Sequence, residues 1–240
     1  MAFILASFLK THLRTPKGKR KPVALDNENG ILDNILSHIP HTDRLVVVAN
    51  DPADHADNDQ KLRVVRKSFE LTGIRFSQAV ALDDRNGNSA KDVISGASLI
   101  ILSGGKCLRQ MEFFERIGLR ELLSDNAALT IGISAGAMNL CSTVANFPEE
   151  AADLAEPRFY YGMGLYGDGA VVPHFDGELC EYQLGGDDFD VAREYILPMS
   201  HTRELIGIPN NSYILIENNG AKSYFGAVYK ILAGEVKRLF

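Results

Sequence analysis

The chain has 240 residues, of which 45 % are hydrophobic and 23 % are charged, an ordinary composition for a globular protein. Its net charge of −6 gives no reason to expect nucleic acid as a partner. Three widely spaced cysteines without a C-x-x-C pair, Cys107, Cys141 and Cys180, argue against a disulfide framework or a structural zinc site and fit a reducing cytoplasm. We find no internal repeat or obvious linker, so we expect one domain over residues 1–240.

The N-terminal segment is apolar over residues 1–9 and basic over residues 10–21. A secretory signal places its positive charge before the apolar run, and this run is too short to span a bilayer. A basic, acid-free start also occurs in organelle presequences, but we expect a cytoplasmic protein without membrane contact. We predict a buried strand over Phe3–Phe8 and then a basic loop, Thr15–Pro22, which is either solvated or attracts an anionic group.

Apolar, β-branched runs alternate with amphipathic segments over most of the chain. This alternation predicts parallel βαβ units, and runs such as Arg44–Val48 are continuously apolar, which is typical of strands covered on both faces. The predicted strands are Phe3–Phe8, Leu45–Ala49, Phe76–Leu82, Ser98–Leu102, Ala128–Ile133 and Ala170–Val172. The predicted helices are Ile31–His38, Asn58–Thr72, Lys106–Ile117 and Ala135–Val144.

The last third of the chain has a different pattern. It begins with a predicted helix over Asp190–Met199 and a core strand over Leu205–Ile208. Turn signals at residues 218–220 and 233–235 then separate short strands. These strands are Tyr213–Glu217, Lys222–Phe225 and Val228–Leu232. We therefore expect an α/β fold that closes with a β-hairpin extension.

The segment Leu129–Leu140 has the pattern of a nucleophile elbow. A β-type run ends in Ser134, and a helix-compatible segment follows at once. The motif G-x-S-x-G, from Gly132 to Gly136, supplies the small residues that such a crowded strand-to-helix turn requires. An ordinary connection that happens to contain this motif is the alternative. The strand-to-helix setting favours Ser134 as a nucleophile.

A second turn, Ser103–Lys106, also ends a strand and opens a helix. In parallel sheets, ligands bind beyond the carboxyl ends of the strands. One N–H of the glycine pair and the N–H of Ala135 would together form an oxyanion hole. Taken alone, the pair indicates only a tight turn that requires glycine. Beside the elbow, we favour the oxyanion role.

A serine nucleophile requires a base, and six histidines are available. His174 directly follows a predicted strand at its carboxyl end, which makes it the first choice, and His55 is the second. His55 lies in an acidic loop, residues 51–59, that offers ligands for a divalent ion. A solvated loop with a helix cap is the favoured interpretation, and we expect no metal.

Together, these motifs resemble the peptidase E family of serine peptidases, which includes aspartyl dipeptidases and cyanophycinases. The resemblance rests on the strand ending in Gly-Gly, the G-x-S-A-G-A elbow, Pro173-His174 and a late Ile-Pro strand end. It implies Ser134 as the nucleophile, His174 as the base, and Gly105 and Ala135 as the oxyanion donors. The implied fold is a three-layer α/β/α sandwich similar to the class I glutamine amidotransferases, where cysteine replaces the serine.

Two positions depart from the family pattern. Lys106-Cys107-Leu108 replaces the common Asn-Thr-Phe, and Asn210 stands where dipeptidases place a glutamate. An asparagine can orient an imidazole, although it stabilises the imidazolium less than a carboxylate does. We therefore take Asn210 as the third catalytic residue. The alternatives for this role are Asp176, Glu178 and Glu217.

The sequence thus predicts a serine peptidase that acts on small peptides through an acyl-enzyme, without a cofactor, as a monomer or homodimer. The resemblance suggests substrates with an acidic N-terminal residue, and Lys106 and Arg109 are candidates to bind that carboxylate. One alternative is an α/β-hydrolase-type esterase, although its histidine would come late in the chain. The other is a non-catalytic binding or regulatory protein on the same scaffold, because Asn210 replaces the expected glutamate.

Overall fold

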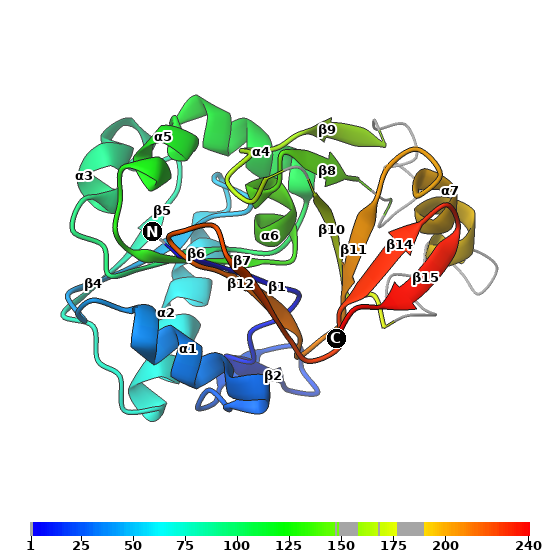
Figure 1. The fold of residues 1–240 in the computed structure, drawn as a ribbon. Helices are drawn as coiled ribbons and strands as arrows, with labels where there is room; N and C mark the ends of the chain where they lie inside the picture. The colour runs from blue at the N-terminus through cyan, green and yellow to red at the C-terminus, as the bar shows by residue number, and fades with distance from the viewer. Residues whose placement is uncertain (1, 147, 149–157, 168, 177–189) are drawn as a thin grey trace.

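A seven-stranded, mostly parallel sheet forms the centre of the molecule (Figure 1). The computed structural model describes residues 2–146, 148, 158–167, 169–176 and 190–240. In spatial order, the strands are β13 (Lys222–Phe225), β12 (Tyr213–Ile216), β1 (Phe3–Ala6), β7 (Leu129–Ile133), β6 (Leu99–Leu102), β4 (Arg44–Val48) and β5 (Gln78–Leu82). The strands β1, β7, β6, β4 and β5 are parallel to one another. Strand β12 pairs antiparallel with β1, and β13 pairs antiparallel with β12.

Helices cover both faces of this sheet (Figure 1). On one face lie α1 (Ile31–His38) and α2 (His55–Leu71), and on the other lie α3 (Ala90–Ile94), α4 (Cys107–Arg116), α5 (Leu119–Ser124) and α6 (Ala135–Leu140). Successive strand residues point to opposite faces. Leu45 and Val47 accordingly pack with α1 and α2, whereas Val46 and Val48 pack in the core beneath the other helices. The predicted three-layer α/β/α arrangement is confirmed.

A second sheet of four strands lies beside the first (Figure 1). Its order is β10 (Ala170–Pro173), β11 (Leu205–Ile208), β14 (Tyr229–Leu232) and β15 (Glu235–Arg238). A π-helical turn, Ala192–Ile196, continues into α7 (Leu197–Met199), which precedes β11 in the chain. The C-terminal hairpin extension is confirmed as two hairpins, β12–β13 on the large sheet and β14–β15 on the small one.

Two predictions about local structure were wrong. The basic segment is not simply a loop, because β2 (His12–Arg14) and β3 (Arg20–Pro22) form an antiparallel hairpin. Its charged strands lack apolar alternation and are held by contacts with α2. These include the ion pair of Arg20 with Asp57 and, directly after β3, a 2.6 Å bond from Ser68 Oγ to the carbonyl of Val23. The predicted helix over Ala135–Val144 ends at Leu140. It is followed by a strand, β8 (Thr143–Ala145), which pairs with β9 (Phe159–Tyr161).

The strand predicted over residues 170–172 exists, but it belongs to the small second sheet and not to the parallel main sheet. Strand β10 pairs in parallel with β11 and has no partner in the large sheet among the described residues. An apolar run predicts burial on both faces, but it does not specify which strand lies beside it. In the described part of the chain, no helix is long and apolar enough to cross a membrane.

Candidate active site

Ser134 lies at the carboxyl end of β7, in the sharp turn that opens α6. Its φ of 51° and ψ of −114° are unusual for a residue with a side chain and cost free energy. The flanking elements hold this conformation, since Ser134 N–H donates to the carbonyl of Ala6 at 2.8 Å and the Ser134 carbonyl accepts from Ala137 and Met138. This strained backbone is the geometry of a nucleophile elbow.

Close packing of α6 against the sheet explains the small residues around Ser134. A Cβ atom built on Gly136 would lie 2.4 Å from the carbonyl oxygen of Leu102 in β6. No side chain fits at that separation, so only glycine allows the helix to start so close to the strands. The elbow motif is therefore required by packing as well as by any chemistry of Ser134.

His174 follows β10 and contacts Ser134 directly. Its Nε2 lies 3.1 Å from Ser134 Oγ, and its Nδ1 lies 2.7 Å from Asn210 Oδ1. Because the amide oxygen can only accept, Nδ1 carries the proton and Nε2 is left to accept from the serine hydroxyl. The three side chains come from β7, β10 and β11, on two different sheets. Their arrangement is a Ser-His-Asn relay.

The glycine turn after β6 faces the same serine. A Cβ on Gly104 would lie 3.1 Å from Ser134 Cβ, so the turn is in direct contact with the elbow. Gly105 has a φ of 143°, and a Cβ there would lie 2.1 Å from Asn50 Oδ1. Ala135 is the first residue of α6, and a first-turn N–H has no acceptor within its own helix. Ala135 thus directly follows Ser134, and Gly105 follows the glycine that contacts it.

Buried amides, which no sequence pattern singles out, support this turn from behind. Asn50 Nδ2 donates to the Lys106 carbonyl at 3.0 Å, and Gln110 Nε2 donates to the Ser103 carbonyl at 2.6 Å. Gln110 is in turn bonded to Asn139 on α6 at 3.0 Å. In sequence, these residues are ordinary polar positions of a strand end and two helices. Only the fold gathers them around one loop.

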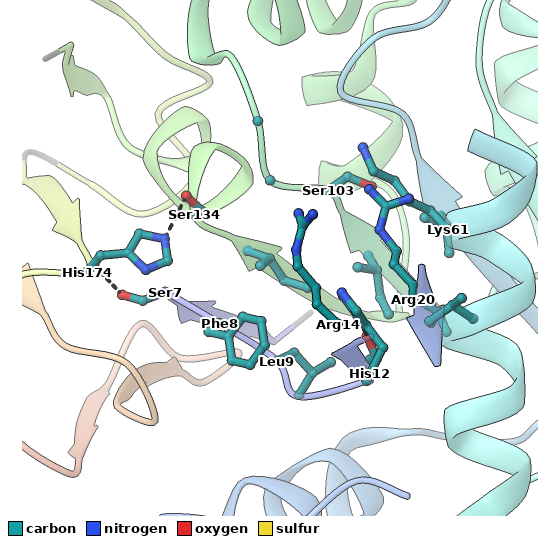
Figure 2. Close-up of a pocket in the computed structure, with 18 residues that line it drawn as sticks. Ser7, Phe8, Leu9, His12, Arg14, Arg20, Lys61, Ser103, Ser134 and His174 are labelled. Carbon is teal, nitrogen blue, oxygen red and sulfur yellow. Dashed lines mark hydrogen bonds between the residues drawn. The ribbon is translucent and has the colours of Figure 1, made fainter. Parts of the chain in front are cut away.

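A cavity of about 310 Å³ opens beside Ser134 and His174. Figure 2 shows it between the elbow and the β2–β3 hairpin, with helix α2 on the far side. Apolar side chains and basic side chains contribute different parts of its wall. The apolar residues are Phe8, Leu9, Val47, Val64, Val65, Ile101 and Ile133, and the basic ones are His12, Arg14, Arg20 and Lys61.

The cations of this cavity differ in how they are paired. Arg20 and Lys61 both contact Asp57, Lys61 at 3.0 Å. Burial would raise the pKa of Asp57, but its hydrogen bonds from Arg20 and Lys61 outweigh this, and the pKa lies below its ordinary value. Burial and the nearby arginines lower the pKa of His12. Among the residues that the structure describes, Arg14 has no ion-pair partner.

Lys106 and Arg109, the two predicted substrate-binding cations, do not line this cavity. Both are exposed, and Arg109 forms a 2.7 Å ion pair with Asp51. The basic hairpin, whose sequence is compatible with either a solvated or an anion-binding segment, lines the cavity instead. A hairpin distant in sequence from the elbow carries no local signal of this placement.

The alternative candidates lie elsewhere or lack free ligand atoms. His55 is exposed and pairs with Asp84, and Glu217 bonds to His38 at 3.1 Å. His55, Asp83 and Asp84 bring ligand atoms within 4.8 Å of one another, but the Arg85 guanidinium occupies both Asp83 oxygens, at 3.0 and 2.7 Å. Of the other residues proposed to orient His174, Asp176 is exposed and Glu178 lies outside the described residues.

Several solved structures share this fold. A peptidase from an acI-B1 Actinobacterium matches with a TM-score of 0.69 at 16 % identity, over 99 % of this chain and 93 % of the other. A protein assigned to peptidase E from Listeria monocytogenes EGD-e matches with a TM-score of 0.57 at 13 % identity, over 100 % of this chain and 98 % of the other. The fold is that of the peptidase E-like proteins.

The family follows from the sequence. Residues 44–224, more than half of the chain, match peptidase family S51. The chain belongs to this family, the peptidase E family, and is a peptidase. No curated protein matches its sequence.

Proposed function

We propose that this protein is a serine peptidase that cleaves small peptides through an acyl-enzyme on Ser134. The observation that carries the proposal is the contact of His174 Nε2 with Ser134 Oγ at 3.1 Å, while Nδ1 is bonded to Asn210. This is the hydrogen-bonded order that activates a serine. The strained backbone of Ser134 and its contact with the glycine turn support the same role.

In the proposed reaction, Ser134 Oγ attacks the scissile carbonyl carbon as its proton passes to His174 Nε2. The N–H groups of Gly105 and Ala135 hold the developing oxyanion. His174 then gives the proton to the leaving amine as the C–N bond breaks. Water attacks the resulting ester as it gives a proton to His174; the C–O bond to Ser134 Oγ then breaks, that proton passes to Ser134 Oγ, and the carboxylic acid product leaves. Asn210 keeps the imidazole in the required tautomer throughout.

The cavity supports a small substrate that carries a negative charge. Its volume of about 310 Å³ lies at the lower end of the range for small-ligand sites. Three cationic side chains, Arg14, Arg20 and Lys61, share its wall, whereas a single carboxylate, Asp57, pairs with the last two and balances only one of their charges. A peptide with an acidic N-terminal residue fits this charge. No part of the proposed reaction requires a metal or an organic cofactor, and the expected location is the cytoplasm.

A dipeptide panel with varied N-terminal residues, combined with a fluorophosphonate probe, tests the proposal. We expect cleavage of dipeptides with N-terminal Asp or Glu and covalent labelling of the folded chain at Ser134. Cleavage of simple esters without any peptide hydrolysis would favour the esterase alternative. An unlabelled serine and no turnover on either class of substrate would favour a non-catalytic binding protein.

Arg14 is expected to bind the negative charge of the substrate. Its guanidinium extends from β2 into the cavity, between Ser134 and Arg20 in Figure 2. A hydrogen bond to a charged group contributes about 1.5–3 kcal/mol, so Arg14→Gln should raise KM for acidic dipeptides by roughly 10- to 100-fold. Steady-state kinetics on acidic and neutral dipeptides measures this change.

Arg109→Gln is the matched control, because Arg109 pairs with Asp51 away from the cavity. It should leave KM within about twofold of the wild type. A large effect of Arg109→Gln together with none of Arg14→Gln would restore the sequence-based assignment of the substrate carboxylate to the α4 side.

Gly105→Ala is expected to disrupt the oxyanion turn. The added Cβ would overlap the Asn50 side chain, with contacts of 2.1 to 2.6 Å, and loss of one oxyanion donor lowers kcat by about 10²- to 10³-fold. Gly73→Ala is the control: Gly73 also has a positive φ, of 90°, but the added Cβ meets nothing within 4 Å. It should cost stability without lowering kcat. Equal kcat losses in both variants would contradict the assignment.

A further inference from the structure

Ser7 is a buried serine at the carboxyl end of β1 that contacts the segment carrying His174. It is 1 % exposed. Its Oγ accepts a hydrogen bond from the backbone N–H of His174 at 3.0 Å and donates to the carbonyl of Ile208. A hydroxyl has one proton to donate and lone pairs to accept with. One side chain therefore satisfies two backbone groups of the second sheet.

The position of Ser7 connects it to all three members of the relay. The preceding residue, Ala6, accepts the N–H of Ser134 at 2.8 Å. His174 follows β10, and Ile208 ends β11 two residues before Asn210. The nucleophile belongs to the large sheet, whereas its base and the orienting amide belong to the small one. The Ser7 hydroxyl thus bonds to the ends of β10 and β11 from β1, the strand that pairs with the nucleophile's strand β7. Figure 2 shows its bond to the His174 segment.

We propose that Ser7 is a positioning residue that aligns the small sheet with the nucleophile, so that His174 and Asn210 are held in register with Ser134. The inference rests on the proposed function. His174 needs such a restraint because its φ of 58° is unfavourable for a residue with a side chain. Without the hydroxyl, the His174 segment can relax, and a displacement of about 1 Å at a catalytic group lowers the rate by about 100-fold.

The test compares Ser7→Ala and Ser7→Thr with the wild type on acidic dipeptides. Removal of the hydroxyl should lower kcat by about 10- to 100-fold with KM within about twofold, because the substrate contacts remain. Ser7→Thr keeps the hydroxyl and should recover most of kcat. A rise in KM at unchanged kcat would overturn the proposal, since Ser7 also lines the cavity and would then act on the substrate.

Ser98→Ala is the matched control for loss of a buried hydroxyl. Ser98 is 0 % exposed and accepts the N–H groups of Asp43 and Arg44 at the opposite, amino end of β6. It should lower the Tm by an amount similar to Ser7→Ala while leaving kcat unchanged. If the loss of kcat in both variants were proportional to their decrease in Tm, the role of Ser7 would be structural only.

The Nδ1–H proton of His174 provides a readout that does not depend on turnover. It is bonded to Asn210 at 2.7 Å, and its NMR signal is assigned by its absence in His174→Ala. Ser7→Ala should shift or broaden this signal, and Ser98→Ala should not. An unchanged signal and unchanged kcat would reject the proposal. An inactive wild type whose signal is lost in Ser7→Ala would reject the proposed function and still support the positioning role.

Discussion

Ser134→Ala is expected to abolish peptide hydrolysis, with kcat falling by at least about 10⁴-fold, and to abolish fluorophosphonate labelling. The reason is chemical, because alanine has no atom to form the acyl-enzyme, while the oxyanion turn and the cavity remain. The fold should tolerate the change. Alanine retains the Cβ atom and the same backbone, and it loses the 3.1 Å contact between the Ser134 hydroxyl and His174.

Binding is the control for this variant. Ser134→Ala should still bind an acidic dipeptide with an affinity similar to that of the wild type, which calorimetry measures directly. If Ser134→Ala retained a substantial part of the wild-type kcat, another residue would be the nucleophile, and the proposed acyl-enzyme would have to be abandoned. If Ser134→Ala unfolded, the circular dichroism spectrum would reveal it before any kinetic conclusion was drawn.

His174→Ala should lower kcat by about 10⁴-fold, because Ser134 then has no base. Residues that act as one unit are not additive, so the double variant Ser134→Ala/His174→Ala should be no less active than Ser134→Ala alone. Steady-state kinetics on the same dipeptide, together with the rate of probe labelling, measures both effects. Loss of labelling in His174→Ala would show that the histidine activates the serine rather than binding the substrate.

His55→Ala decides between the two histidines that the sequence proposes as the base. His55 is exposed and paired with Asp84, and it does not line the cavity. Its removal should change kcat by less than about twofold. A loss of activity in His55→Ala without one in His174→Ala would reverse the assignment of the base.

Much of the fold was predictable because its signals are local. The continuously apolar run Arg44–Val48 indicates a strand covered on both faces, and β4 is such a strand between two helical layers. The pattern around Ser134 predicts a strand-to-helix turn, and the structure has one with a φ of 51°. Burial and close packing restrict which residue types fit at a position, so both features can be predicted from the sequence.

The second sheet was not predictable in the same way. The apolar runs of β10 and β11 indicate core strands, but nothing in them specifies pairing with β14 rather than with the large sheet. Likewise, the charged sequence of the β2–β3 hairpin is typical of a solvated loop. The hairpin forms because of contacts with the distant helix α2, such as the bond from Ser68 to Val23 directly after β3. Pairing between distant segments is determined by how the whole chain packs, and not by the local sequence of either segment.

The sequence by itself determined the α/β class, the strained turn at Ser134 and the position of His174 after a strand, because each depends on neighbouring residues. Only the tertiary structure decided that His174 bonds to both Ser134 and Asn210, that the cavity carries Arg14 rather than Lys106 or Arg109, and that Ser7 links the two sheets. These contacts join residues from 36 to 201 positions apart, and such a separation leaves no periodic pattern along the chain. A site built across two sheets is therefore defined by how the sheets pack.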